Sequence, residues 1–442
     1  MAKIGSLSGF PEWLPEERIV EQHVLDVLRT TFELHGFSGI ETRAVEPVQQ
    51  LLSKGETSKE IYLLRRLQAQ GSEDAELGLH FDLTVPLARY VLEHAGKLDF
   101  PFRRYQIQKV WRGERPQDGR FREFVQADVD VVGQDTLAFH HEIELPLVMV
   151  DALSQLPIPR VVIHASNRKV AQGFYEAIGI SDVEETLRII DKLDKVGPDV
   201  VKELLSERVG ATSQQGDLAL SLAQITGEDG RFADEVLALG YRNESLEQGL
   251  EELVNLVEGA NDLIPGSVIA DLKIARGLDY YTGSVYESVM IGHEDLGSVC
   301  SGGRYDSLVS NGKKTFPGVG LSIGVSRILA RLIGKNLVEP SRKVPAAVLI
   351  AVNDEEERRH AERTAFTLRH RGIAVEVSPN SAKFGKQIKY ADKRGIPFVW
   401  FSTDDGEQVK DIRTGEQVNA DAATWAPPAD DARPQIASVQ QN

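Results

Sequence analysis

The spacing of apolar residues predicts a long helix near the amino end of the chain and a strand after it. Apolar side chains recur at helical spacing after Pro15, a favoured first residue of a helix, and Gly36 follows the last of them. The stretch from Ile40 to Val45 is typical of a strand, which Pro47 confines to an edge or an end of a sheet. An amphipathic helix beside an edge strand suits a subunit interface, and packing on its own domain is the alternative.

Between Phe102 and Val132 the pattern changes to an alternation of apolar and polar residues around a polar turn at 113–119. This pattern predicts a long antiparallel hairpin. One face of its return strand is apolar and suited to a core, with Phe121, Val125, Val129 and Val131. The other face carries Arg120, Arg122, Phe124, Gln126, Asp128 and Asp130. That mixture of side chains favours the floor of a ligand-binding site, where the ring stacks on a base and the arginines bind phosphates. A solvated strand face is the alternative.

The chain after this hairpin predicts a sheet domain interrupted by helices. Residues 181–260 are acidic and apolar at helical spacing, whereas strand character returns from Val268 to Glu287. A sheet that resumes after helices indicates one split domain. We therefore expect a sheet domain at 1–180 and 261–335, with a helical insertion domain at 181–260.

A separate module is predicted at the carboxyl end. Apolar strand-like runs alternate with charged helix-like runs over residues 343–425, which is typical of an independent α/β domain. Residues 426–442 contain three prolines and no apolar period, so we expect them to form a disordered tail.

The charge and cysteine content narrow the classes of protein that the chain can belong to. With 50 basic and 67 acidic residues, the net charge of −17 argues against general affinity for polyanions, so a nucleic acid would need a local basic patch. The densest patch is Lys383, Lys386, Lys389, Lys393 and Arg394. One cysteine, Cys300, excludes an intramolecular disulfide and a cysteine-based zinc site. No apolar run approaches the about 18 residues of a membrane span, and the amino end lacks a signal-peptide core. We expect a soluble cytoplasmic protein.

Several further motifs bear on chemistry. No Walker-type glycine-lysine loop occurs, so any bound ATP must be held by side chains. Glycines accompany arginine and tyrosine in 276–283 and 301–306, where the backbone could approach a ligand closely; a turn with tyrosines over a core is the alternative. Arg327 falls in the first turn of a predicted helix, where it is either paired with an anion or solvated.

Together these segments resemble the histidyl-tRNA synthetase family of class II aminoacyl-tRNA synthetases, from Phe10 to about Trp425. Motif 2 of the class corresponds to Trp111-Arg112-Gly113-Glu114-Arg115-Pro116 followed by Arg120-Phe121-Arg122-Glu123-Phe124. Motif 3 corresponds to Pro317 through Arg327. Two signatures mark histidine specificity, Arg276-Gly277-Leu278-Asp279-Tyr280-Tyr281 and Gly302-Gly303-Arg304-Tyr305-Asp306.

The resemblance implies an α+β protein with an antiparallel-sheet catalytic domain, a helical insertion and a C-terminal α/β anticodon-binding domain. It implies a homodimer, with the 15–47 segment as motif 1. The implied enzyme is a histidine–tRNA ligase of protein biosynthesis, which activates L-histidine with ATP to histidyl-adenylate and transfers the histidyl group to tRNA(His). ATP would act as a substrate with Mg²⁺, whose ligands no segment identifies, and no prosthetic group is implied.

The resemblance also implies roles for particular residues. Arg112 and Arg276 are the catalytic pair, at the α-phosphate of ATP. The other ATP-binding residues are Glu114 at the adenine amino group, Phe124 at the ring face, and Arg120 and Arg327 at the γ-phosphate. The histidine-binding residues are Asp82, Leu83, Thr84, Arg112, Gln126, Asp130, Arg276, Tyr280, Tyr281 and Tyr305. Asp82 and Asp130 replace glutamates that bacterial members of the family often carry.

A non-catalytic relative provides the alternative function. The synthetase-like regulatory subunit of ATP phosphoribosyltransferase shares the fold, but it typically loses the catalytic arginine signature and lacks the C-terminal domain. This chain has both Arg276 and the 343–425 module, which favours the enzyme.

Overall fold

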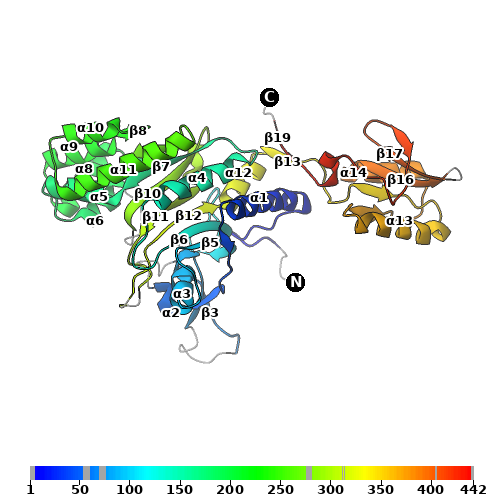
Figure 1. The fold of residues 1–442 in the computed structure, drawn as a ribbon, viewed down its shortest axis with the longest axis horizontal. Helices are drawn as coiled ribbons and strands as arrows, with labels where there is room; N and C mark the ends of the chain where they lie inside the picture. Colours follow the sequence, from blue (N-terminus) through cyan, green and yellow to red (C-terminus); the bar gives the residue numbers. More distant parts are fainter. Residues whose placement is uncertain are drawn as a thin grey trace. The chain divides into compact units, whose positions relative to one another are not determined.

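The computed structural model describes residues 5–52, 60–68, 76–274, 281–310, 312, 314–403 and 406–439. The chain forms two compact units. The first combines Met1–Pro11 with Leu25–Arg331, and the second combines Glu12–Val24 with Leu332–Asn442. Figure 1 shows the helices and strands of both. In the described part of the chain, no helix is long and apolar enough to cross a membrane.

The predicted first helix and hairpin are confirmed. Helix α1 spans Pro15–Leu34 and buries Val20, Val24, Leu28 and Phe32. Strands β5 (Phe102–Trp111) and β6 (Glu123–Val132) pair antiparallel along their whole length, from Phe102 opposite Val132 to Trp111 opposite Glu123. The hairpin therefore has ten residues on each side and a turn that contains the polar segment.

The strand predicted at 40–45 is wrong, because the chain changes sheets there. Strand β1 (Ser38–Gly39) pairs parallel with β5 and then ends. Strand β2 (Val45–Pro47) instead joins β4 (Leu77–Leu79) and β3 (Leu63–Leu64) in a separate small sheet. The short helix α2 (Val48–Leu51) follows β2 directly.

A nine-stranded sheet organises the first unit, in the order β1-β5-β6-β12-β11-β10-β7-β9-β8. The strands beyond β6 are β12 (Gly318–Gly324), β11 (Cys300–Tyr305), β10 (Tyr281–Met290), β7 (Val161–Asn167), β9 (Val268–Asp271) and β8 (Thr226–Gly227). Neighbouring strands are antiparallel except for β1 beside β5 and β7 beside β9. This confirms the predicted antiparallel sheet.

Segments that connect or follow these strands form four further helices: α3 (Thr84–His94), α4 (His140–Ser154), α5 (Arg168–Ala177) and α12 (Val325–Gly334). The 3-10 turn η2 (Glu294–Leu296) lies between β10 and β11. Helix α4 is tied to the sheet where the Tyr286 hydroxyl donates to the Glu142 carbonyl oxygen at 2.7 Å.

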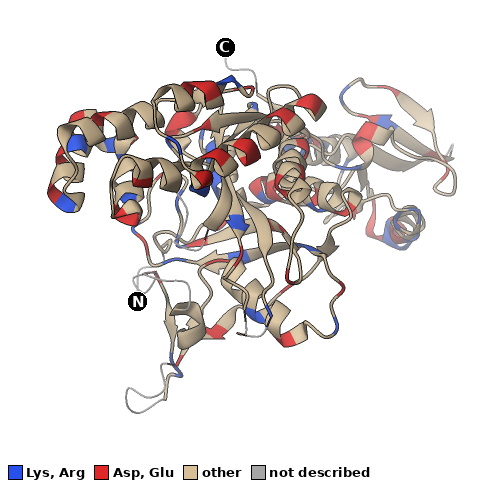
Figure 2. Cartoon of the chain, turned by 60° about the vertical axis from the view of Figure 1, so that its left-hand side comes forward, with Lys and Arg blue, Asp and Glu red and all other residues tan. Residues whose placement is uncertain are grey.

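The predicted helical stretch at 181–260 is helical. It contains α6 (Val183–Ile190), α7 (Leu193–Val196), α8 (Pro198–Val209), α9 (Ser213–Ala223), α10 (Arg231–Ala238) and most of α11 (Glu244–Leu263). Asp and Glu recur along the helices of the first unit in Figure 2. These helices belong to the same compact unit as the sheet, and a Cβ on Gly249 would lie 2.6 Å from the Val170 amide nitrogen of α5. The domain boundaries at 180 and 261 stay a prediction.

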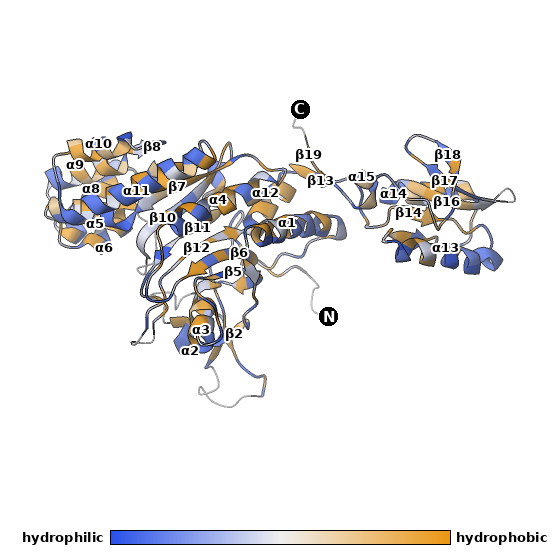
Figure 3. Ribbon diagram, viewed as in Figure 1, coloured by the Kyte–Doolittle hydropathy of each residue, from blue (hydrophilic) through white to orange (hydrophobic). Residues whose placement is uncertain are grey.

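The second unit contains a five-stranded sheet ordered β15-β14-β16-β17-β18. Its strands are β14 (Val348–Ile350), β15 (Val375–Val377), β16 (Phe398–Thr403), β17 (Gly406–Asp411) and β18 (Gln417–Asn419). Successive β14 residues enter two cores, one shared with α13 (Arg358–His370) and one with α14 (Phe384–Arg394). In Figure 3 hydrophobic colour marks the strands of this sheet, and hydrophilic colour marks much of α13. The turn η3 (Glu355–Glu357) leads into α13.

The prediction of a disordered tail is wrong for residues 426–439. Helix α15 (Ala429–Ala432) and strand β19 (Ile436–Ser438) are formed, and β19 pairs antiparallel with β13 (Val338–Pro340). The Arg342 side chain is buried and donates to the Asp431 and Ala432 carbonyl oxygens. The prolines prevent a long helix, but backbone pairing with a distant strand orders the segment without an apolar period of its own.

Candidate active site

A polar cavity of about 330 Å³ lies at the turn end of the β5–β6 hairpin. It is lined by Arg112, Glu114, Gly119, Arg120, Phe121, Phe124, Gln126, Lys195, Ser298, Val299, Ser301, Ser322, Gly324 and Arg327. The structure thus brings together all the described residues that the sequence predicts to bind ATP. Phe121 corrects the predicted facing of the strand: β6 begins only at Glu123, so the alternation does not extend back to this ring.

The cavity has a positive excess within an acidic chain. Its lining includes four cationic side chains, Arg112, Arg120, Lys195 and Arg327, and one carboxylate, Glu114. The Arg112 guanidinium carbon lies 5.1 Å from the centroid of the Phe124 ring, which is within the range of a cation–π interaction. A lining of this kind is suited to an anion with an attached flat ring.

Arg112 also joins this cavity to the segment that the sequence predicts to bind histidine. Its Nε donates to the Phe81 carbonyl oxygen at 2.9 Å. The next residue, Asp82, is buried, and its Oδ1 accepts from the Val85 amide at 3.1 Å in the first turn of α3. Leu83 is fully buried and Thr84 begins the helix. The backbone around residue 82 is therefore fixed from both sides.

Gln126 lies at the boundary between the cavity and the interior of the sheet. Its Nε2 donates to Ser322 Oγ at 2.7 Å, which orients the amide. Its Oε1 is buried and has no hydrogen-bond partner among the described residues. A buried acceptor without a partner costs free energy, so a ligand that donates a hydrogen bond here would be stabilised.

Asp130 is contacted by side chains from β5, which pairs with β6, and from β11, which lies beyond β12 on the other side. The Tyr305 hydroxyl of β11 donates to its Oδ1 at 2.8 Å, and Arg104 Nη2 of β5 lies 2.6 Å from its Oδ2. Gly320 of β12 makes room, because a Cβ there would lie 2.0 Å from Asp130 Oδ1. Burial raises the pKa of the neighbouring Asp128 to about 7, Arg104 opposes that rise, and the Asp130 charge adds to it.

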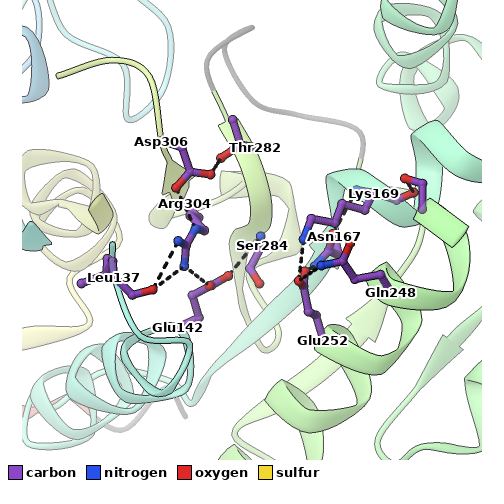
Figure 4. A network of polar contacts seen from close by, with 11 residues as sticks. Leu137, Glu142, Asn167, Lys169, Gln248, Glu252, Thr282, Ser284, Arg304 and Asp306 are labelled. Atoms are coloured by element: carbon purple, nitrogen blue, oxygen red, sulfur yellow. Dashed lines mark hydrogen bonds and ion pairs between the residues drawn. The ribbon is translucent and has the colours of Figure 1, made fainter. Parts of the chain in front are cut away.

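The two tyrosine signatures meet at adjacent strands. Tyr281, the first residue of β10, is the register partner of Tyr305. Behind them, Arg304 makes ion pairs of 2.8 Å with Glu142 of α4 and 3.0 Å with Asp306 (Figure 4). Because successive strand residues point to opposite faces, this network holds β11 from the side opposite Tyr305. Arg276 and Tyr280, both predicted at the site, lie outside the described residues.

Sequence reasoning missed several neighbours of the site. Lys195 comes from the helical stretch, about 70 residues from the hairpin in sequence, and Ser298 presents its carbonyl oxygen to Arg327. Arg104 carries no motif signal, although its place on β5 opposite Asp130 follows from the hairpin register. Arg122, predicted on the ligand face, instead donates through Nε to the Glu114 carbonyl oxygen at 3.1 Å and braces the turn.

The sheet, its hairpin-end cavity and the separate α/β domain define a class II aminoacyl-tRNA synthetase. The chain belongs to the histidyl-tRNA synthetase family, whose sequence profile matches residues 9–328. An anticodon binding domain profile matches residues 346–424.

Full-length relatives agree with this assignment. The chain is 56% identical to the histidine–tRNA ligase of Micrococcus luteus over 100% of both chains, and 57% identical to that of Bifidobacterium animalis subsp. lactis over 97% of each. The crystal structure of histidyl-tRNA synthetase from Nostoc sp. is 36% identical, with a TM-score of 0.84 over 95% of this chain and 97% of that one. An ATP phosphoribosyltransferase regulatory subunit/histidyl-tRNA synthetase from Bacillus halodurans matches with a TM-score of 0.72 over 87% of this chain and 96% of that one, but at 19% identity it shows the fold alone.

Proposed function

We propose that the protein is a histidine–tRNA ligase, which joins L-histidine to tRNA(His) through a histidyl-adenylate. The observation that carries the proposal is the cavity at the hairpin end, where the five described residues expected to bind ATP converge in a chain of this family. Similarity to named ligases along the whole chain supports it.

The cationic cavity would bind ATP. Arg112 and Arg276 would contact the α-phosphate, Arg120 and Arg327 the γ-phosphate, and Phe124 the adenine ring. Glu114 would accept from the adenine amino group. The distribution of four cations along the cavity supports this assignment, since the triphosphate carries the complementary charge.

Histidine would bind deeper along the same strands. Gln126 and Asp130 would meet the polar groups of the amino acid, beside Asp82, Leu83, Thr84, Tyr280, Tyr281 and Tyr305. Gln126 Oε1, which has no hydrogen-bond partner in the described part of the chain, supports this placement, as does the buried position of Asp130. A buried site built to hydrogen-bond an imidazole rejects rings that leave its polar groups unpaired.

The reaction would proceed by attack of the histidine carboxylate on the α-phosphorus, with pyrophosphate leaving. No base is required, because the attacking carboxylate is ionised near pH 7. Fixed guanidinium groups stabilise the negative charge that develops on the α-phosphoryl oxygens. The described residues group no three His, Cys, Asp or Glu side chains in an arrangement for a metal. As the family resemblance implies, Mg²⁺ would bind the nucleotide phosphates and neutralise part of their charge.

The remaining parts of the proposal concern organisation and partners. Residues 1–180 and 261–335 would form the catalytic domain, 181–260 the insertion and 343–425 the anticodon-binding domain. The enzyme would act in the cytoplasm as a homodimer in which the 15–47 segment contributes to the interface. Residues 343–425 would bind the anticodon region of tRNA(His).

The non-catalytic regulatory subunit is the less favoured function. The anticodon-domain profile at residues 346–424 and the end-to-end similarity to histidine–tRNA ligases both argue against it. Structural likeness to the Bacillus halodurans protein carries no functional weight at its level of identity.

Histidine-dependent charging of tRNA(His) tests the proposal. The purified protein should attach labelled histidine to this tRNA in the presence of ATP and Mg²⁺, and not to a tRNA for another amino acid. Changing the exposed lysines of α14, Lys386, Lys389 and Lys393, together to alanine should raise the tRNA requirement while adenylate formation stays unchanged. Absence of charging by a folded, ATP-binding protein would contradict the proposal.

A further inference from the structure

One face of the β5–β6 hairpin carries a row of six polar side chains, of which only Gln126 lines the ATP cavity. Three residues of β5 lie directly opposite three residues of β6 in the register: Arg104 opposite Asp130, Gln106 opposite Asp128, and Gln108 opposite Gln126. Each is two residues from the next along its strand, so all six lie on one face of the sheet. We call these six residues the polar ladder. It begins at Gln126 in the cavity wall and ends at the buried Asp130.

Arg104 is the cation of this ladder. Its side chain is 0% exposed, and Nη2 lies 2.6 Å from Asp130 Oδ2 and 3.9 Å from Asp128 Oδ2. Nη1 donates to Gln106 Oε1 at 3.3 Å. Gln106 is in turn oriented by Thr42 and Gln108, to whose side-chain oxygens its Nε2 donates at 2.9 Å and 2.6 Å. The guanidinium therefore lies between two carboxylates and is itself held in place.

We propose that Arg104 is a positioning residue for histidine recognition: it fixes the Asp130 side chain in the orientation that meets the amino acid. This inference rests on the proposed function, because it assumes that Asp130 contacts histidine. Arg104 acts through Asp130 and has no contact with the reacting atoms. The ATP cavity is lined without it.

Charge compensation is the first reason for this role. Asp128 and Asp130 are each 3% exposed and lie two residues apart on one face of β6. Two buried carboxylates on one face disfavour each other's ionised form, and burial adds to the effect. Arg104 opposes both contributions, and its Nη2 lies 2.6 Å from Asp130 Oδ2. Without it, Asp130 would lose the cation beside the carboxylate that is expected to accept from the ligand.

Orientation is the second reason. Asp130 has one fewer methylene than a glutamate and so reaches less far from its strand. Tyr305 holds one of its oxygens and Arg104 approaches the other, from strands on opposite sides of β6. One oxygen accepts from Tyr305 and the other lies 2.6 Å from a guanidinium nitrogen, so the carboxylate is restrained before histidine binds and less ordering entropy is lost on binding.

Stability alone does not explain a buried arginine here. Replacing a buried ion pair by apolar residues is often neutral or stabilising, because the desolvation of the charges offsets their attraction. A purely structural position would tolerate a smaller and simpler side chain. The presence of a guanidinium at this depth, directly beside the proposed histidine ligand, points to a role in binding.

The test compares Arg104→Met and Arg104→Lys with Arg103→Met in the full-length protein. Arg103 is the adjacent residue on the opposite face, where it pairs with Glu144 at 2.6 Å and covers the Phe37 ring, so it controls for loss of an arginine from β5. The KM for histidine and the KM for ATP are measured by pyrophosphate exchange. Histidine binding without ATP is measured by calorimetry.

Arg104→Met should raise the KM for histidine and weaken calorimetric histidine binding by at least about 10-fold, with the KM for ATP within about twofold, because a charged partner of the ligand-binding group is lost. Arg104→Lys should give a smaller increase, since the charge remains but the planar fork is lost. Adding Asp128→Asn to Arg104→Met should recover part of the histidine affinity, because it removes the neighbouring carboxylate. Arg103→Met should change neither KM.

Unchanged histidine binding in Arg104→Met, or equal increases in both KM values, would overturn the inference. If Arg104→Met does not fold, Arg104→Lys decides: a selective rise in the histidine KM supports the inference, and wild-type values for both substrates overturn it. Failure of the wild-type protein to exchange pyrophosphate with histidine would instead contradict the proposed function itself. The two failures are therefore distinguishable.

Discussion

The two ends of the proposed active site differ in how they manage charge. At the hairpin end, cationic side chains line an open cavity, and Arg120 is exposed to solvent. At the inner end, Asp130 is buried between the Tyr305 hydroxyl and the Arg104 guanidinium. The hairpin end has an excess of positive charge, whereas at the inner end the Arg104 charge compensates that of Asp130.

This difference matches the chemistry of the two substrates that we propose. A nucleotide brings its own negative charge, so a site for it can leave cations facing the solvent until the ligand arrives. An amino acid carries little net charge, and its recognition depends on oriented donors and acceptors in a dry environment. Substitutions at the nucleotide end should therefore weaken ATP binding by small steps. At the amino-acid end, loss of one hydrogen-bond partner should lower the selectivity for histidine.

The largest effect is expected from Arg276, which we propose contacts the α-phosphate. This residue would place a fixed positive charge at the α-phosphate, where charge develops in the transition state. Arg276→Ala should lower the rate of adenylate formation by at least about 10²-fold, roughly 2.7 kcal/mol. Single-turnover adenylate formation measured beside a thermal melt checks this. Arg242→Ala, which removes an exposed arginine of a surface ion pair, is the control. A stable Arg276→Ala enzyme with near wild-type adenylation would contradict the catalytic role.

Asp130→Ala should weaken histidine binding selectively. Loss of a buried charged partner costs about 1.5–3 kcal/mol, so the KM for histidine should rise by roughly 10- to 100-fold while the KM for ATP changes little. Pyrophosphate exchange with each substrate varied in turn measures both values. Equal effects on the two substrates would show a general loss of structure and remove the contrast between the ends.

Arg120→Ala should weaken ATP binding and leave histidine binding unchanged, with a smaller effect than that of Asp130→Ala on histidine. Because this side chain is exposed, its interaction with the γ-phosphate is screened by water, and we expect about a fivefold rise in the KM for ATP with an unchanged KM for histidine. The same exchange assay applies. A change in the histidine requirement alone would reverse the assignment of the two ends.

The smallest effect concerns stability and pH at Asp128. Burial raises the pKa of this carboxyl to about 7, above its unfolded value, so the folded state holds the proton more tightly. Its contribution to stability is therefore present at acidic pH and lost as the pH rises through about 7. Asp128→Asn should raise the melting temperature by about 2–4 °C at pH 8 and change it little near pH 4, close to the unfolded pKa. A gain of the same size at both pH values would contradict the raised pKa.

Local patterns predicted the hairpin and the second unit well, because alternation and apolar runs report directly on nearby structure. The β5–β6 pairing and the placement of Phe124 and Gln126 followed from period-two spacing and residue chemistry. Long-range contacts carried no such signal. Lys195 reaches the cavity from a distant helix, and β19 is ordered by pairing with β13 rather than by its own sequence. At Gly39, where β1 ends, a Cβ would lie 2.9 Å from the Tyr105 ring, and no local pattern in the sequence reports this close approach.

Pyrophosphate exchange with each of the twenty amino acids tests the central claim most directly, since it measures activation at both ends of the site at once. The assay needs the wild-type protein, ATP, Mg²⁺ and labelled pyrophosphate, and no tRNA. We predict exchange that is stimulated by histidine and by no other amino acid. Exchange with a different amino acid, or no exchange by a folded protein that binds ATP, would contradict the account.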